Sequence, residues 1–328
     1  MAASHTAVWQ QATVIESVAL TSRIRRIVLA PEQPVPVQPG AHVDVEMTVR
    51  GARDERSYSV VDATSDGTRI ALSVYLSEAS RGGAEVMHAL SPGDRVRLTQ
   101  PLQDFPLRFG APSYALLAGG IGVTAIAGMA SALRAAGADY RFVYCGRSHD
   151  AMAYLDELRA IHGDRLELHV GAEGTTLDVP DFIAGVPERA EVYLCGPIRL
   201  MDAVRRAWTA AGRSDPDLRF ETFGNSGWFA PEAFRVSIPA LGVETTVSRD
   251  QTLLVALEAA GADPLFDCRK GECGLCEARI IDVHGDIDHR DVFYSERQRD
   301  ARSKICPCVS RIRSDAAGRG GSVTLQLS

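Results

Sequence analysis

The sequence predicts three domains: an antiparallel β-barrel, an α/β domain with a parallel sheet, and a C-terminal domain built around cysteines. Three observations lead to this prediction. Apolar and polar residues alternate along the first hundred positions, strand-like and helix-like segments alternate along the next hundred, and five of the seven cysteines lie between Cys268 and Cys308. A chain of 328 residues agrees, because single hydrophobic cores stop growing near ~250–300 residues. We expect the domains at 1–110, 111–224 and 235–328, with a linker at 225–234.

Composition narrows the class of protein before any motif is considered. A net charge of −7 and a pI near 5.7 argue against nucleic acid or an anionic membrane as the main partner. An odd number of cysteines in so long a chain does not resemble a secreted disulfide framework. The uncharged stretch 113–133 is interrupted by four glycines, which fits a strand, a turn and a helix better than a membrane span. We therefore expect a cytoplasmic protein that is a monomer.

The barrel prediction depends on strands that are half buried. Residues 43–49 alternate apolar with polar side chains, 70–76 repeat the pattern, and 96–98 do so briefly after the turn at 92–94. One short helix is expected at 84–90. Antiparallel strands separated by turn residues, with a single short helix, favour a barrel.

The segments that follow residue 112 change in character. Apolar strand-like runs now alternate with helical runs of about ten to twelve residues, which is typical of βαβ units on a parallel sheet. Strands are expected at 114–118, 141–145, 166–170 and 192–195, and helices at 125–136, 151–161 and 201–211. The stretch Gly224-Asn225-Ser226-Gly227 has the composition of a flexible joint. After it, strands are expected at 234–238 and 244–247 and a helix at 252–260.

The C-terminal cysteines have the spacing of an iron–sulfur site. Cys268, Cys273 and Cys276 form C-x4-C-x2-C, the spacing of plant-type ferredoxins that hold a [2Fe–2S] cluster. Glycines at 271 and 274 suit a loop that must wrap the cluster closely. The fourth ligand is either Cys306 or Cys308. A structural zinc site or unligated buried thiols are the alternatives.

Two short motifs in the barrel region suit a flavin. Arg56-Ser-Tyr58-Ser59, expected at the start of a strand, supplies positive charge, an aromatic face and a hydrogen-bond donor. Arg81-Gly82-Gly83 precedes the short helix, where backbone N–H groups and a forked side-chain donor can bind a phosphate. An ordinary strand and an ordinary turn are the alternative interpretations.

Two loops of the α/β region suit a nicotinamide dinucleotide. The segment 116–124 carries Gly119, Gly120 and Gly122 between a strand and a helix, although it lacks the G-x-G-x-x-G string. The segment 193–197 ends another strand, so both loops are expected at one edge of the sheet. Arg147 and Ser148 follow a third strand and could meet the adenosine ribose. Close packing of strand and helix, or a solvated loop, would explain the same residues without a ligand.

The four motifs, in this order along the chain, resemble the phthalate dioxygenase reductase family, which includes vanillate demethylase reductase subunits. The resemblance covers essentially the whole chain. It implies an FMN-binding barrel, a ferredoxin reductase-like NADH domain, and a β-grasp ferredoxin domain with a plant-type [2Fe–2S] cluster. FMN rather than FAD also agrees with the lack of an aromatic segment after Tyr75 that would hold an adenine.

The resemblance also implies roles for particular residues. The string Cys308-Val-Ser-Arg matches the family's last cluster ligand, which makes Cys306 a spare thiol. Phe223 matches the aromatic residue that covers the flavin in ferredoxin–NADP reductases. The residues expected to bind the flavin and nicotinamide cofactors are Arg56, Tyr58, Ser59, Arg81, Gly82, Gly83, Gly120, Gly122, Thr124, Arg147, Ser148, Cys195, Gly196, Pro197 and Phe223. The residues expected at the site of hydride transfer are Ser59, Thr124, Cys195 and Phe223.

The function that the resemblance implies is electron transfer from NADH through FMN and the cluster to a separate oxygenase. That acceptor would be a Rieske-type non-haem iron protein or a cytochrome P450. Two alternatives stay open at this point. One is a stand-alone NADH-dependent reductase of quinone, ferric iron or O2, and the other is a zinc-stabilised scaffold with no redox activity.

Overall fold

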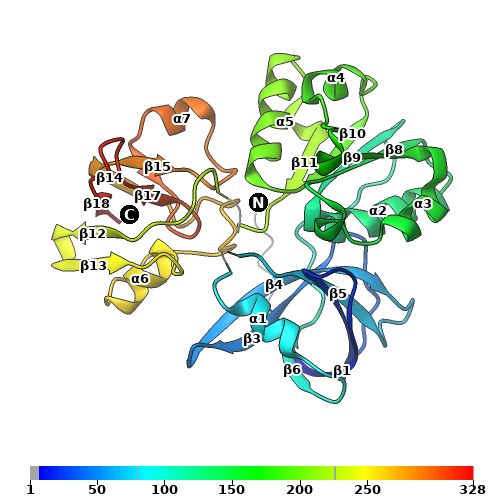
Figure 1. Ribbon diagram of the computed structural model, residues 1–328, viewed down its shortest axis with the longest axis horizontal. Helices are drawn as coiled ribbons and strands as arrows, with labels where there is room; N and C mark the ends of the chain where they lie inside the picture. The colour runs from blue at the N-terminus through cyan, green and yellow to red at the C-terminus, as the bar shows by residue number, and fades with distance from the viewer. Residues whose placement is uncertain (1–6, 79, 225–226, 328) are drawn as a thin grey trace. The chain divides into compact units, whose positions relative to one another are not determined.

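The computed structural model describes residues 7–78, 80–224 and 227–327 and divides into two compact units. The first unit extends to Gly196 and also includes Ala203–Glu221 (Figure 1). The second unit contains Pro197–Asp202 and the chain from Thr222 onward. Each unit is described by itself below.

The first unit begins with a closed six-stranded barrel, as the alternating pattern predicts. Its strand order is β1-β2-β5-β4-β3-β6, and every pairing is antiparallel. Inward-facing apolar side chains fill the barrel, and Met87 of helix α1 joins that core. The elements are β1 (Trp9–Ala19), β2 (Ile24–Pro31), β3 (His42–Val49), β4 (Ala52–Ala63), β5 (Ile70–Tyr75), α1 (Gly83–Ala89) and β6 (Arg95–Thr99).

The predicted position of the Arg56–Ser59 motif is wrong in one respect. These residues lie in the middle of β4, because β4 pairs with β3 from Ala52 opposite Val49 as far as Ser59 opposite His42. The reversal before it occurs at Arg50 and Gly51, which both have positive φ. The motif therefore lies on a stretch of β4 that is paired with β3 along its whole length, which fixes the direction of its side chains.

The rest of the first unit is a five-stranded parallel sheet with the order β11-β10-β7-β8-β9, which confirms the α/β prediction. The central strand β7 is buried along its whole length. The elements are β7 (Tyr114–Gly119), α2 (Val123–Ala135), β8 (Tyr140–Gly146), α3 (Leu155–His162), β9 (Leu166–Val170), α4 (Val179–Ala184), β10 (Glu191–Cys195), α5 (Ile198–Ala210) and β11 (Leu218–Glu221).

Helix α3 starts later than the helix predicted at 151–161. Residues His149–Ala151 form a separate 3-10 turn, and Tyr154 has a φ of +64° immediately before the helix. The Tyr154 hydroxyl lies 2.5 Å from that of Ser73 in the barrel. A tertiary contact thus holds a backbone conformation that local sequence does not favour.

The second unit has a mixed five-stranded sheet with the order β13-β12-β18-β14-β16 and a separate β15-β17 pair. Helix α6 packs Leu253, Ala256 and Leu257 into the core formed by this sheet, as in a β-grasp fold. The elements are β12 (Phe234–Ile238), β13 (Val243–Val247), α6 (Leu253–Ala259), β14 (Ala278–His284), β15 (Asp286–Asp288), α7 (Glu296–Asp300), β16 (Lys304–Ile305), β17 (Arg311–Arg313) and β18 (Ser322–Gln326).

The expected linker at 225–234 includes Trp228, which is bonded within the second unit. Asn225 and Ser226 lie outside the described residues, but Trp228 is held at two points. Its backbone N–H donates to Asp288 Oδ1 and its indole N–H to Asp202 Oδ2, both at 3.1 Å. From Trp228 onward the segment is therefore fixed to its own unit. Within the described ranges, no helix has the length and apolarity needed to cross a bilayer.

Candidate functional site

The candidate flavin residues on β4 are brought together with the start of helix α1. A Cβ on Gly83 would lie 3.3 Å from Arg56 Cγ, so the Arg56 side chain lies directly against the glycine pair. Arg56 also pairs with Asp54 Oδ2 at 2.5 Å. Tyr58 packs against the barrel core, and burial raises the pKa of its phenol, which therefore stays neutral. The aromatic ring, the guanidinium and the phosphate-type loop thus belong to one region of the barrel.

Helix α1 begins in a way that requires glycine. Gly82 has a φ of +100°, and a Cβ there would lie 2.5 Å from Val49 Cγ1. The Gly82 N–H donates to Ser80 Oγ at 3.2 Å, and Arg81 is half buried next to it. The backbone can therefore approach an anion closely at this turn, with an arginine beside it.

A buried hydrogen bond joins β4 to the last strand of the parallel sheet. The Ser59 hydroxyl donates to Glu221 Oε2 at 3.4 Å, and both residues are buried. Glu221, which stands two positions before Phe223, is a residue that the sequence analysis did not identify. Its signal was its place at the carboxyl end of a parallel strand, where ligand-binding residues of such sheets gather. Phe223 itself belongs to the second unit, so its role over the flavin stays a prediction.

The two nicotinamide-type loops lie side by side, as predicted from their strand ends. Strands β7 and β10 are neighbours, with Ala118 opposite Cys195. A Cβ on Gly122 would lie 2.3 Å from the Cys195 carbonyl oxygen and 2.9 Å from the Gly196 nitrogen. The hydroxyl of buried Thr124 donates to the Ile121 carbonyl at 2.9 Å, which closes the turn that enters helix α2. Because any side chain at position 122 would collide with the second loop, glycine there allows the two loops to lie side by side at the edge of the sheet.

The remaining candidates follow strands β7 and β8 along the chain or precede helix α5. Gly120 has a φ of +54° at the end of β7, and Pro197 stands just before helix α5. Arg147 is exposed after β8, and its carbonyl accepts from the Ala172 N–H at 2.8 Å. Ser148 accepts through its carbonyl from the Ala151 N–H at 3.0 Å. The backbone of the loop that carries Arg147 is therefore held by one bond from the turn after β9 and by one bond within the loop itself.

The cysteine loop of the second unit directs backbone donors onto sulfur. The N–H groups of Lys270, Glu272 and Cys273 all point at Cys268 Sγ, each at 3.4 Å. The Leu275 N–H points at Cys273 Sγ at 3.5 Å. Such donors stabilise thiolate sulfur and tune the potential of iron–sulfur clusters. The loop therefore fits the group that its spacing predicts.

Glycine is required in this loop for close packing as well as for conformation. Gly271 has a φ of +80°, and a Cβ there would lie 2.6 Å from Val309 Cγ2 and 2.9 Å from the Asp291 Cα. Gly274 has a φ of +73° and lies under the Phe293 ring. Within the described ranges, no three Cys, His, Asp or Glu side chains converge as ligands of a single metal ion would. A two-iron cluster instead distributes its four thiolates over two metals.

Cys306 and Cys308 are both buried, and both belong to one buried cluster with Cys276. Hydrogen bonds from Cys306 and Cys308 hold the pKa of Cys276 well below that of an ordinary thiol. Cys308 as the fourth ligand, which the resemblance implies, stays a prediction.

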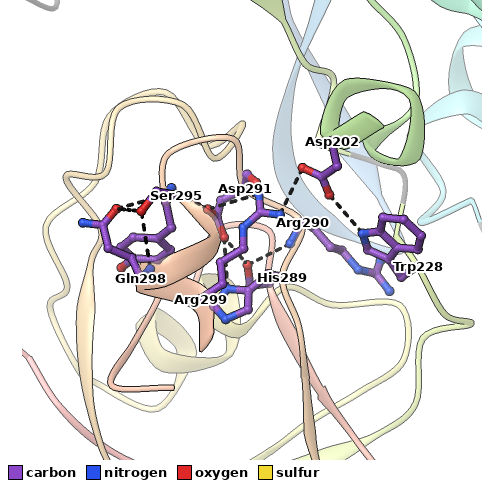
Figure 2. A network of polar contacts seen from close by, with 10 residues as sticks. Asp202, Trp228, His289, Arg290, Asp291, Ser295, Gln298 and Arg299 are labelled. Carbon is purple, nitrogen blue, oxygen red and sulfur yellow. Dashed lines mark hydrogen bonds and ion pairs between the residues drawn. The ribbon is translucent and has the colours of Figure 1, made fainter. Parts of the chain in front are cut away.

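A polar network fixes the segment that supports the loop, as Figure 2 shows. Asp291 is completely buried and accepts from the Tyr294 N–H at 3.0 Å, the Ser310 hydroxyl at 3.1 Å and His289 Nδ1 at 3.3 Å. Burial alone would raise the pKa of Asp291, but the His289 and Tyr294 hydrogen bonds and the Arg299 charge hold it below its ordinary value. The next residue, Val292, donates its N–H to the Gly271 carbonyl at 2.9 Å, so the network positions the cysteine loop.

Comparisons with known proteins agree with this geometry. Residues 238–313 match the family of 2Fe-2S iron-sulfur cluster binding domains. The chain is 35% identical to the beta subunit of a heme-dependent oxidative N-demethylase from Ectopseudomonas mendocina, over 88% of each chain. It is 33% identical to a vanillate O-demethylase oxidoreductase from a Pseudomonas species, over 85% of this chain and 88% of that one.

Two solved structures are similar to nearly the whole length of this chain. Phthalate dioxygenase reductase is similar over 97% of this chain and 98% of its own, with 28% identity and a TM-score of 0.72. An intact self-sufficient cytochrome P450 monooxygenase is similar with 34% identity and a TM-score of 0.65, and there the chain spans about two fifths (41%) of the larger protein. With a barrel, a nicotinamide-type sheet and a cysteine loop in this order, the chain belongs to the phthalate dioxygenase reductase family of NADH-dependent flavin and iron–sulfur oxidoreductases.

Proposed function

We propose that this chain is the reductase component of a multicomponent oxygenase. It would accept electrons from NADH in the first unit and deliver them from the second unit to a separate Rieske-type oxygenase or cytochrome P450. The observation that carries this proposal is the presence, in one chain, of the loop pair Gly122 and Cys195 and of the cysteine loop with its N–H donors. When it is bound, FMN can accept two electrons together as a hydride and pass them on one at a time.

The chain's own residues would then act by binding and orienting. Arg56 and the Arg81–Gly83 turn would hold the flavin phosphate, Tyr58 would lie against the ring, and the Ser59 hydroxyl would be fixed by Glu221. The residues proposed to orient the nicotinamide dinucleotide are Gly120, Gly122, Thr124, Arg147, Ser148, Cys195, Gly196 and Pro197. Phe223 would cover the flavin until the nicotinamide replaces it. Cys268, Cys273, Cys276 and Cys308 would ligate the cluster.

The partner is proposed from the names of the relatives. They include subunits of demethylase and carnitine monooxygenase systems, and one structural relative is a self-sufficient P450. A separate oxygenase is therefore the proposed acceptor. A cytoplasmic location, a monomeric state and the domain boundaries at 1–110, 111–224 and 235–328 remain part of this proposal.

One spectroscopic experiment tests the proposal directly. The purified chain is examined by absorption, by iron and acid-labile sulfide content, and by chromatography of the released flavin. We expect FMN, two irons per chain, and loss of both the flavin and the cluster absorption when NADH is added without oxygen. A colourless protein that contains zinc, or a coloured one that NADH does not reduce, would contradict the proposal.

A further inference from the structure

The segment 147–154, which joins β8 to α3, begins with two of the residues proposed to orient the dinucleotide. Two hydroxyl groups of the barrel bond to this segment. The Ser73 hydroxyl of β5 lies 2.5 Å from that of Tyr154, and the hydroxyl of Thr21, between β1 and β2, donates to the Asp150 carbonyl at 2.7 Å. A loop of the α/β domain is therefore fixed by side chains of the barrel that carries the proposed flavin residues.

Tyr154 has a backbone conformation that tyrosine seldom adopts. Its φ of +64° and ψ of +19° lie in the left-handed region, which is unfavourable for residues that have a Cβ. Such a conformation persists only where the surrounding structure holds it in place. The bond to the buried Ser73 hydroxyl is a contact of this kind, and burial raises the pKa of the Tyr154 phenol, which therefore keeps its proton.

The same segment packs against the ends of two strands of the parallel sheet. A Cβ on Gly146 would lie 2.2 Å from Met152 Cγ, so the Met152 side chain lies directly against the end of β8. A Cβ on Gly120, which follows β7, would lie 3.8 Å from the Ala151 carbonyl oxygen, an ordinary van der Waals distance. The position of the segment therefore sets both the space beside Gly120 and the path of the chain as it leaves β8.

We infer that Tyr154 is a positioning residue for the dinucleotide. Through its bond to Ser73, it holds the segment 147–154 in the conformation that binds NADH. This inference rests on the proposed function, in which the segment contacts the dinucleotide. A segment that is already ordered binds a ligand more tightly than one that must be ordered on binding, because the loss of conformational freedom then opposes association. The contribution of Tyr154 is therefore to affinity and not to the chemical step.

The experiment compares Tyr154→Phe and Ser73→Ala, each in the full-length chain that holds flavin and cluster. Each variant removes one hydroxyl of the pair and keeps the rest of the side chain. Tyr140→Phe is the matched control, because it removes a buried tyrosine hydroxyl at the other end of β8, where it bonds to His162 Nδ1 at 2.7 Å. Anaerobic stopped-flow absorption over a range of NADH concentrations gives an apparent dissociation constant and a limiting rate of flavin reduction. Thermal melts report the stability of each protein.

We expect Tyr154→Phe and Ser73→Ala each to raise the apparent dissociation constant for NADH about tenfold, the effect of one lost hydrogen bond. Their limiting rates should stay within about twofold of wild type, since an interaction that serves only binding does not change the chemical step. The double variant should bind NADH no more weakly than either single variant, because both remove the same bond. Tyr140→Phe should be less stable than wild type but bind NADH equally well.

Other outcomes would overturn the inference. An unchanged dissociation constant in both variants would show that the bond to Ser73 does not act on the dinucleotide. A lower limiting rate with unchanged affinity would place the effect in the chemical step instead. Equally weak binding in Tyr140→Phe would assign the effect to a general loss of stability. A wild-type chain whose flavin NADH does not reduce would overturn the proposed function itself, and the inference with it, before any variant is compared.

Discussion

At Ser59, a small hydroxyl is buried on the face of β4 opposite to the one by which Tyr58 and Val60 meet the barrel core, and Glu221 Oε2 accepts its proton at 3.4 Å. A hydroxyl held in this way keeps one orientation, and its lone pairs are left to accept a hydrogen bond. The two residues are 162 positions apart in sequence, and the contact exists only because the end of β11 lies beside β4. The Arg56-Ser-Tyr58-Ser59 motif therefore identifies Ser59, whereas Glu221 can be found only after the sheet is assembled.

We expect Ser59→Ala to slow reduction of the bound flavin by NADH. Removing a buried hydrogen-bonding partner costs roughly 1–3 kcal/mol, and each 1.4 kcal/mol is about tenfold in rate, so the expected loss is about 10- to 100-fold. The rate is measured by anaerobic stopped-flow absorption. Ser57→Ala is the matched control, because Ser57 is exposed on the same strand and donates to Asp44. Equal rates for the two variants would exclude a role of Ser59 in the reaction.

Among the elements, the turn from β7 into α2 shows how tightly two loops can be joined. The sequence predicts the strand, the glycines and the helix, since apolar runs and glycine turns are local signals. It cannot show that Gly122 in particular contacts the Cys195 carbonyl, because that depends on β10 being the neighbour of β7. The late start of α3 was missed for a similar reason, since the contact between Tyr154 and Ser73 lies outside the helix.

Substitution of Gly122 tests this turn. The Cβ of Gly122→Ala would lie 2.3 Å from a backbone oxygen that cannot easily move, so we expect a loss of about 1–3 kcal/mol in stability and weaker NADH binding. Gly128→Ala in helix α2 is the control, because its Cβ would meet Val61 O at an ordinary 3.8 Å. Thermal melts and NADH titrations check both effects. A Gly122→Ala protein as stable as the control would contradict the close approach.

The loop that contains Asp291 gives a pH-dependent prediction. The pKa of Asp291 is lower in the folded than in the unfolded chain, so its stabilising effect is complete above about pH 5 and is lost as the pH falls through about 3.9 toward the folded value. Asp291→Asn leaves buried donors without a charged acceptor and should cost about 3–5 kcal/mol at neutral pH.

Denaturant unfolding of wild type and Asp291→Asn from pH 7 to pH 3 measures this effect. The difference in unfolding free energy between the two proteins should shrink as the pH falls. Asp282→Asn serves as the control, because Asp282 is exposed on β14 and pairs only with exposed His284 among the contacts described. A difference that stays constant with pH would show that the Asp291 carboxylate is not the titrating group.

At the scale of the whole molecule, the order of the motifs was sufficient to predict the fold class. The barrel and the parallel-sheet domain each have a local pattern of apolar residues, and the third domain has a characteristic cysteine spacing. The structure confirms the barrel, the parallel sheet and the C-terminal sheet domain. The limits of the units were not predictable in the same way. Pro197–Asp202 belongs with the second unit although it lies within the predicted α/β domain, because Asp202 bonds to Trp228 and Arg299 far along the chain.

The proposed order of electron transfer predicts that two activities can be separated. Cys273→Ser should abolish reduction of cytochrome c, a one-electron protein acceptor, because the cluster loses a ligand. Reduction of the flavin by NADH should remain near the wild-type rate, since Cys273 belongs to the second unit and the flavin residues to the first. Steady-state cytochrome c assays and anaerobic flavin bleaching measure the two activities. Equal loss of both would refute the proposed order.

Trp228 has a consequence for how this protein can be observed. It is one of three tryptophans, its indole N–H donates to Asp202, and the Arg199 guanidinium lies 5.3 Å from its ring centroid. An indole with a carboxylate and a cation so close emits light that depends on both neighbours. After Trp9 and Trp208 are replaced by phenylalanine, its fluorescence would report, in real time and without a label, whether the start of helix α5 stays attached to β15 during turnover.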